Sequence, residues 1–60
     1  MTAEALRALL SLSGLSTRAL ARMLDVSPMW VSRRATGAVP ITTSDAAAIV
    51  AALESVGGRR

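Results

Sequence analysis

Residues 15–37 read LSTRALARMLDVSPMWVSRRATG, and this stretch decides the fold that we predict for the chain. Its first part, residues 17–24, places apolar side chains at helical spacing directly after Ser16, a residue type that caps helix N-termini well. The side chains expected on the inner face of this helix are Leu20, Met23 and Leu24. The pattern therefore predicts a short amphipathic helix over residues 17–24.

A second short helix follows after only three residues. Ser27 is again a good N-cap, and Pro28 suits the first helical turn, where no amide donor is required. Gly37 can adopt the left-handed conformation that ends many helices. The sequence thus predicts a helix over residues 28–36, joined to its predecessor by a tight turn at residues 25–27.

The residues around this turn suit two helices that cross closely. Ala21 is small where the second helix has to approach the first, and Asp25 can take a left-handed backbone, though less easily than glycine. The apolar side chains that can hold the two helices together are Leu20, Leu24, Val26 and Val31. We therefore predict a helix-turn-helix over residues 17–36.

A helix over residues 2–13 is predicted to precede this unit. Thr2 can cap its start, Glu4 in its first turn suits the helix dipole, and Gly14 is a plausible stop. Its expected apolar face consists of Leu6, Leu9 and Leu10.

A fourth helix is predicted to follow, from Thr42 to about Ser55. Asp45 lies three residues after Thr42, which gives an approximate capping box. The expected buried side consists of Ile49, Leu53 and Val56. We thus predict an all-α, compact four-helix domain over residues 1–56, followed by a flexible basic tail over residues 57–60.

The composition argues against an enzyme. The 60 residues include no cysteine and no histidine, so thiolate and imidazole chemistry is absent, and neither a metal site nor a cofactor is expected. The four carboxylates are spread along the chain without a local pair: Glu4, Asp25, Asp45 and Glu54. No apolar run approaches the ~20 residues of a membrane span, and no secretory signal is evident, so we expect a cytoplasmic protein without a small-molecule substrate.

The basic residues indicate a different class of partner. All seven are arginine, the formal net charge is +3, and the guanidinium fork fits phosphate groups and guanine edges. At about 100° per residue, one side of the helix over residues 28–36 collects Pro28, Met29, Ser32, Arg33 and Thr36. Such a face can enter a major groove, where Arg33 can bond guanine and Met29 can touch a thymine methyl group, while Ser32 can bond a base or a phosphate.

Other residues are expected to hold the DNA backbone. The amides near Thr17 and Arg18, at the start of their helix, are placed to bind a phosphate. Arg18 and Arg22 lie one helical turn apart, and we expect at least one phosphate contact between them. For Arg34 three alternatives stay open: a head in water, stacking on Trp30, or a phosphate contact.

Residues 15–53, about two-thirds of the chain, resemble the Cro/CI-type (XRE) helix-turn-helix family of phage and bacterial repressors. The matching strings are LSTRALAR at 15–22, VS at 26–27, WVSRR at 30–34, Gly37 and PIT at 40–42, followed by Ile49 and Leu53. The chain departs from the family at three positions, with Asp25 for the turn glycine, Arg34 for an apolar residue and Ala19 for an acidic one.

The resemblance implies a lambda-repressor-like fold, a recognition helix over residues 28–36, and a partner that is a double-stranded DNA operator bound by a possible homodimer. Carried over by position, it implies base contacts from Pro28, Met29, Ser32 and Arg33. It implies backbone contacts from Thr17, Arg18, Ser27 and Thr36.

The leading hypothesis is therefore a small Cro-like, sequence-specific transcriptional regulator. Two alternatives are a protein-interaction module such as an antitoxin, and a nonspecific nucleoid-type DNA binder. Trp30 is expected in or beside the core, and Arg7 is expected to be a solvated surface charge.

Overall fold

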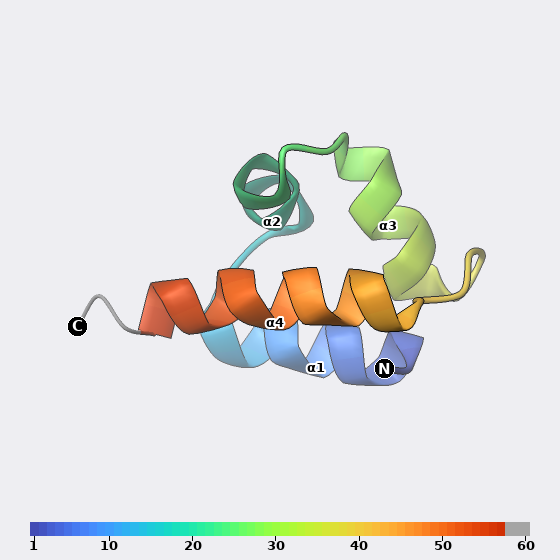
Figure 1. The fold of residues 1–60 in the computed structure, drawn as a ribbon, viewed down its shortest axis with the longest axis horizontal. Helices are drawn as coiled ribbons and strands as arrows, with labels where there is room; N and C mark the ends of the chain where they lie inside the picture. Colours follow the sequence, from blue (N-terminus) through green and yellow to red (C-terminus); the bar gives the residue numbers. More distant parts are fainter. Residues whose placement is uncertain (58–60) are drawn as a thin grey trace.

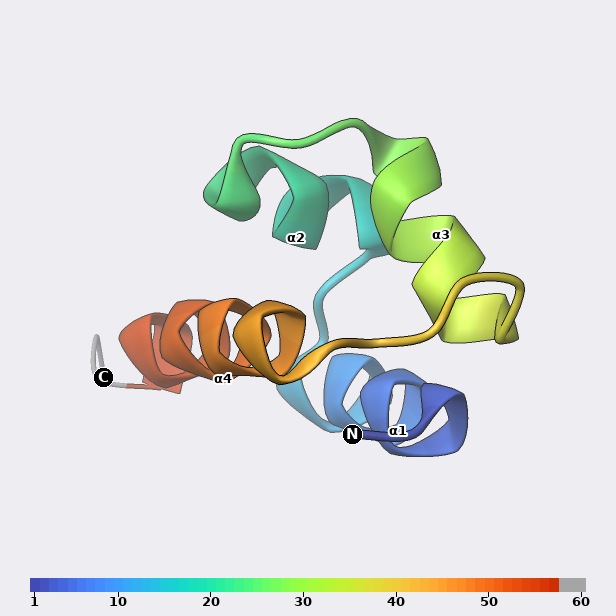
Figure 2. The same ribbon diagram turned by 45° about the vertical axis from the view of Figure 1, so that its right-hand side comes forward.

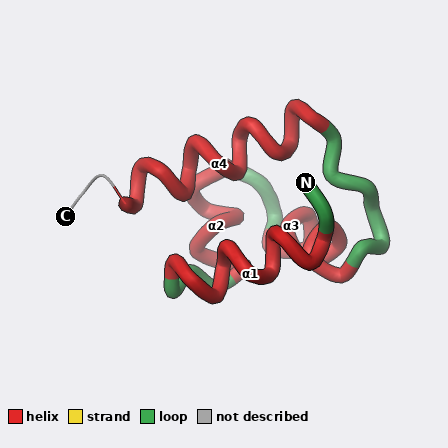
Figure 3. The backbone as a smooth tube through the Cα atoms, turned by 90° about the horizontal axis from the view of Figure 1, so that it is seen from below, coloured by secondary structure: helices red, strands yellow, loops and turns green. Residues whose placement is uncertain are grey.

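Four helices make up the fold in the computed structural model, which describes residues 1–57 (Figure 1). They are α1 (Ala3–Ser13), α2 (Thr17–Leu24), α3 (Pro28–Thr36) and α4 (Thr43–Gly57). Helices α1 and α4 run in the same general direction (Figure 3), and α2 and α3 lie on one side of them (Figures 1 and 2). No strand occurs in the described residues, so the predicted all-α, four-helix fold is confirmed.

The predicted N-caps begin the first three helices. The side-chain oxygens of Thr2, Ser16 and Ser27 each accept a hydrogen bond from the amide three residues later, at 3.0, 3.1 and 3.3 Å. These bonds satisfy amides that lack a partner within the helix. Pro28 occupies the first turn of α3, as its fixed φ and missing donor allow.

Left-handed residues end the same three helices. Gly14 and Gly37 have φ of 71° and 87°, and Asp25 takes this conformation between α2 and α3 with φ 58° and ψ 44°. Asp25 is the one described non-glycine residue with positive φ. The sequence prediction of a left-handed Asp25 is confirmed, and this residue turns the chain so that only three residues separate α2 from α3.

Helix α4 begins with the predicted capping box. The Asp45 amide donates to Thr42 Oγ1 at 3.0 Å, and Asp45 Oδ2 accepts from the Thr42 amide at 3.2 Å. The helix includes Gly57, so it extends two residues past the predicted end and takes in the first residue of the predicted tail. The rest of that tail, residues 58–60, lies outside the described residues.

The core draws on all four helices. Its buried members are Leu6, Leu10, Leu20, Ala21, Val31, Ala35 and Ile49. Ala21 is only 1% exposed, which agrees with its predicted place where α2 and α3 approach each other. Because a longer side chain there would overpack the interior, alanine allows the close approach of these helices.

Two predictions about buried side chains need correction. Met23 was expected on the inner face of α2, but it is 41% exposed. The buried side of α2 is set by Leu20, Ala21 and Leu24, and Met23 lies about 100° away from its centre at 3.6 residues per turn. Leu53 and Val56, both expected to be buried, are half-buried in the second half of α4.

Arg7 is exposed, as the sequence suggested, but its charge also has a partner within the protein. Its guanidinium donates from Nη1 to the main-chain oxygen of Ala35, near the C-terminal end of α3. The last carbonyls of a helix lack intrahelical partners and carry partial negative charge, so a cation stabilises them. Arg7 therefore links α1 to the C-terminal end of α3.

Candidate nucleic-acid interface

One side of α3 is open to solvent along its whole length. The exposed residues on this side are Pro28, Met29, Ser32, Arg33 and Thr36, the five that the helical spacing places together. Met29 is 58% exposed, although an apolar side chain at a helix start often packs inward. The face therefore presents a guanidinium, hydroxyl groups and a flexible apolar side chain on a rigid backbone.

The opposite side of α3 is held by the rest of the domain. Val31 and Ala35 are buried, and Trp30 is half-buried against the core. The Arg34 guanidinium lies 3.8 Å from the centre of the Trp30 ring, and the Arg34 side chain is 15% exposed. Of the three alternatives for Arg34, stacking is the one observed and the head in water is wrong, while the phosphate contact stays a prediction. The outward face of α3 consequently has a fixed orientation relative to the core.

Arg34 is also tied to protein oxygens by two hydrogen bonds. It donates from Nη1 to the Trp30 carbonyl at 3.1 Å and from Nε to Asp45 Oδ2 at 3.0 Å. The hydrogen bond from Arg34 holds the pKa of Asp45 below its usual value of 3.8. The hydrogen bond from the Thr42 amide also lowers this pKa, whereas desolvation raises it. Arg34 thus supports α3 from behind, and the ion pair with Asp45 is a feature that the sequence reading missed.

Three arginines are left over for an outside partner. Arg18, Arg22 and Arg33 are exposed and form no salt bridge or side-chain hydrogen bond within residues 1–57. All three belong to α2 or α3, whereas Arg7 of α1 and Arg34 of α3 are bound to the protein itself. Positive charge that is free to bind anions is therefore concentrated on the α2–α3 side of the described domain.

The hydroxyl groups predicted to hold the DNA backbone differ in what they can donate. Ser27 Oγ accepts from the Trp30 amide, which leaves its own hydrogen free for a phosphate. Thr36 Oγ1 donates to the Arg33 carbonyl at 3.1 Å, so its single hydrogen is already engaged. Because a phosphate oxygen needs a donor, Thr36 is the weaker backbone-contact candidate of the two.

The first turn of α2 offers main-chain donors. The Ala19 amide donates to Ser16 Oγ, and the Leu20 amide donates to the Ser16 carbonyl. The amides of Thr17 and Arg18 come just before these two. The Thr17 side chain itself is half-buried. Thr17 therefore contributes to the candidate interface mainly through its main chain.

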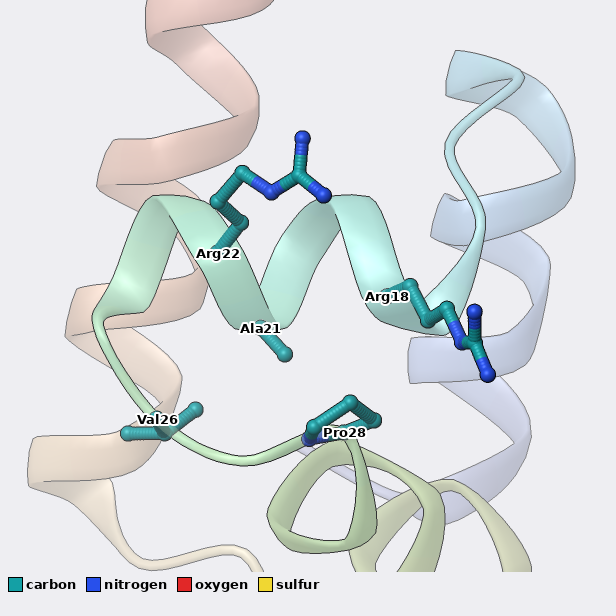
Figure 4. A pocket seen from close by; sticks show the side chains of 5 residues that line it. All are labelled: Arg18, Ala21, Arg22, Val26 and Pro28. Carbon is teal, nitrogen blue, oxygen red and sulfur yellow. The ribbon is translucent and has the colours of Figure 1, made fainter.

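Two pockets lie beside the exposed face. One, of about 300 Å³, lies between α2 and the start of α3 and is lined by Arg18, Ala21, Arg22, Val26 and Pro28 (Figure 4). The other, of about 370 Å³, is lined by Ser27, Met29, Trp30, Arg33, Arg34 and Val39. Each combines arginine with apolar atoms, and together they flank the N-terminal half of α3.

Residues 1–57 offer neither a metal centre nor a membrane-spanning helix. No group of three or more side chains there could hold a metal ion. None of the described helices is long and apolar enough to cross a bilayer. Comparisons with protein-family models, curated proteins and solved structures gave no match, so the resemblance to the Cro/CI-type family stays a prediction from the residues.

Proposed function

We propose that this chain binds double-stranded DNA sequence-specifically, as a small regulator of transcription, with α3 in the major groove. The observation that carries the proposal is the division of α3 into two sides. Its rear is fixed by Val31, Ala35 and the Trp30–Arg34 stack. Its front leaves the side chains of Met29, Ser32 and Arg33 exposed. A protein that reads base edges needs such a combination of rigid support and free side chains.

The front of α3 carries chemistry that can tell base pairs apart. Arg33 can donate two parallel hydrogen bonds to guanine O6 and N7, the commonest specific contact in major grooves. Met29 can contact the methyl group of thymine, and Ser32 can bond either a base or a phosphate. Pro28, at the start of the helix, would approach the base edges through apolar contact alone, because it has no amide hydrogen.

The charge distribution supports α2 as the element that holds the phosphates. Arg18 and Arg22 line a pocket together with Pro28, the first residue of α3, while Glu4 and Glu54 belong to α1 and α4. Phosphate contacts of this kind supply much of the affinity for DNA and make it fall with added salt. We therefore place the DNA against α2 and α3, with α1 and α4 away from it.

Selection of binding sites from a random pool of duplexes tests the proposal, with gel shifts of the selected and scrambled sites at low and moderate salt. Recovery of a consensus, bound at least 10³-fold more tightly than scrambled DNA, is the expected result. A consensus with two-fold symmetry and half-sites about 34 Å apart would report a dimer. Equal affinity for all duplexes would instead indicate a nucleoid-type binder.

The alternative of a protein-interaction module has one observation in its favour. Large apolar side chains are exposed on each helix, namely Leu12 at 85%, Met29 at 58%, Met23 at 41% and Val50 at 41%. The same gel shift separates the two functions. Absence of binding to any duplex at low salt would reject the DNA-binding proposal and favour the interaction module.

A further inference from the structure

The pocket between α2 and the start of α3 has two chemically different parts. Ala21, Val26 and Pro28 contribute apolar atoms, and Figure 4 shows Ala21 pointing from α2 toward Pro28. Arg18 and Arg22 line the same pocket from α2, and their side chains extend in different directions. An occupant that satisfies both parts must have an apolar portion and anionic groups at two separate points.

The two arginines are available for such an occupant. Neither forms a salt bridge or side-chain hydrogen bond within the described chain, so each guanidinium has its five N–H donors free. Residues four apart on a helix have Cβ atoms about 5–6 Å from each other. Because the two side chains then diverge, they are better placed to bind two anionic groups than to close on a single one.

We propose that this pocket holds one deoxyribose of the DNA backbone, with Arg18 and Arg22 each binding one of the two phosphates that flank that sugar. The carbon atoms of the sugar lie against Val26 and Pro28, which line the pocket, and the phosphates lie toward the two guanidinium groups. This inference rests on the proposed function and extends it, because it assigns two consecutive phosphates of one strand to two named side chains.

The pocket also links backbone binding to base reading. Pro28 lines the pocket and is at the same time the first residue of α3. A strand held against Pro28 therefore fixes how deeply the N-terminal turn of α3 enters the groove. Arg18 and Arg22 would in this way act as positioning residues for Met29, Ser32 and Arg33, besides adding affinity.

The test pairs protein variants with duplexes in which one phosphate is replaced by an uncharged methylphosphonate. Binding of the selected site by Arg18→Ala and Arg22→Ala is measured by fluorescence anisotropy for every linkage along both strands. Each arginine variant should lose about 10-fold in affinity, as expected for a hydrogen bond to a charged group, and the salt slope should fall by about one. Replacing the phosphate that the arginine binds should also lower the DNA affinity of the wild-type protein by about 10-fold.

The decisive readout is the coupling between the arginine substitution and the replacement of a phosphate. In Arg18→Ala, neutralising the phosphate that Arg18 binds should have little further effect, and the same should hold for Arg22→Ala at the adjacent linkage of the same strand. Ala8→Glu, on the exposed side of α1, lowers the net charge by the same amount and serves as the control. It should show no coupling to either linkage, and circular dichroism should show that all variants keep the helical fold.

The outcomes separate this inference from the proposed function. Additive losses at every linkage, or coupled linkages that lie on different strands or are not adjacent, would overturn the sugar–phosphate pocket while leaving DNA binding intact. Unchanged affinity of both arginine variants would likewise overturn the sugar–phosphate pocket and leave DNA binding intact. Failure of the wild-type protein to bind any duplex would remove both proposals together.

Discussion

Arg34 Nε lies 3.0 Å from Asp45 Oδ2, and this ion pair joins the rear of α3 to the first turn of α4. The same carboxylate oxygen accepts a hydrogen bond from the Thr42 amide, so one atom serves both the cap of α4 and the support of α3. The Arg34 guanidinium also lies against Trp30. The orientation of the exposed face of α3 therefore depends on the place where α4 begins.

The ion pair predicts a loss of stability in acid. The pKa of Asp45 is lower in the folded protein than its usual 3.8, chiefly because of the hydrogen bond from Arg34, so protonation of Asp45 favours the unfolded chain. The stabilisation by ionised Asp45 is complete above pH ~3.8. It is lost as the pH falls through the lower pKa that Asp45 has in the folded protein. Urea unfolding followed by circular dichroism between pH 2.5 and 7 measures this dependence.

The matched variant for this measurement is Asp45→Asn, which keeps the size of the side chain and removes its titration. Its free energy of unfolding should lie below that of the wild type at pH 7, and the two values should converge at the acid end. The other carboxylates are the same in both proteins, so their effect cancels in the difference. A constant difference between the two proteins across this range would show that the ion pair contributes nothing to folding.

Arg33 is expected to determine one base of the DNA site. Arg33→Ala should weaken binding of the selected site by about 1–3 kcal/mol and remove the preference at a single position. Arg33→Lys keeps the charge and loses the planar fork, so it should retain nonspecific affinity but not the preference for guanine. Competition among the four base pairs at each position measures both effects. An unaltered preference in Arg33→Ala would show that a different face of α3 enters the groove.

Local sequence signals were sufficient to predict the four helices to within two residues at each end. Thr2, Ser16 and Ser27 as caps, and Gly14 and Gly37 as stops, act over three or four residues, so their roles can be read directly from the chain. The exposed face of α3 was predictable for a similar reason, because 3.6 residues per turn fixes which side chains share a side once the helix is known.

The missed contacts join residues that are distant in sequence. Arg34 and Asp45 are 11 residues apart, and Arg7 and Ala35 are 28 apart. No periodicity brings either pair together, because each depends on the tertiary arrangement of the helices. The sequence therefore predicted which residue types the interface holds, but not which of the arginines were already bound within the protein.

Removal of the link between α1 and α3 tests one of these missed contacts. Arg7→Met keeps most of the apolar stem and loses the donor to the Ala35 carbonyl. The protein should be destabilised by about 0.5–1.5 kcal/mol, the usual net contribution of an intramolecular hydrogen bond. Chemical denaturation checks the value, and Arg22→Met, whose guanidinium has no partner in the described chain, is the control that should unfold like the wild type.

The left-handed Asp25 predicts an order of stability among substitutions in the turn. A side chain at φ 58° crowds its own main chain, and the penalty for an ordinary residue is about 1–2 kcal/mol. Asp25→Ala should therefore destabilise the domain by about 1 kcal/mol, since alanine lacks the local hydrogen bonding that makes aspartate tolerable in this conformation. Asp25→Gly should be at least as stable as the wild type, because glycine adopts positive φ without strain. Thermal unfolding of the three proteins at one pH gives the order directly, and an alanine variant as stable as the glycine variant would mean that the turn does not hold this conformation in solution.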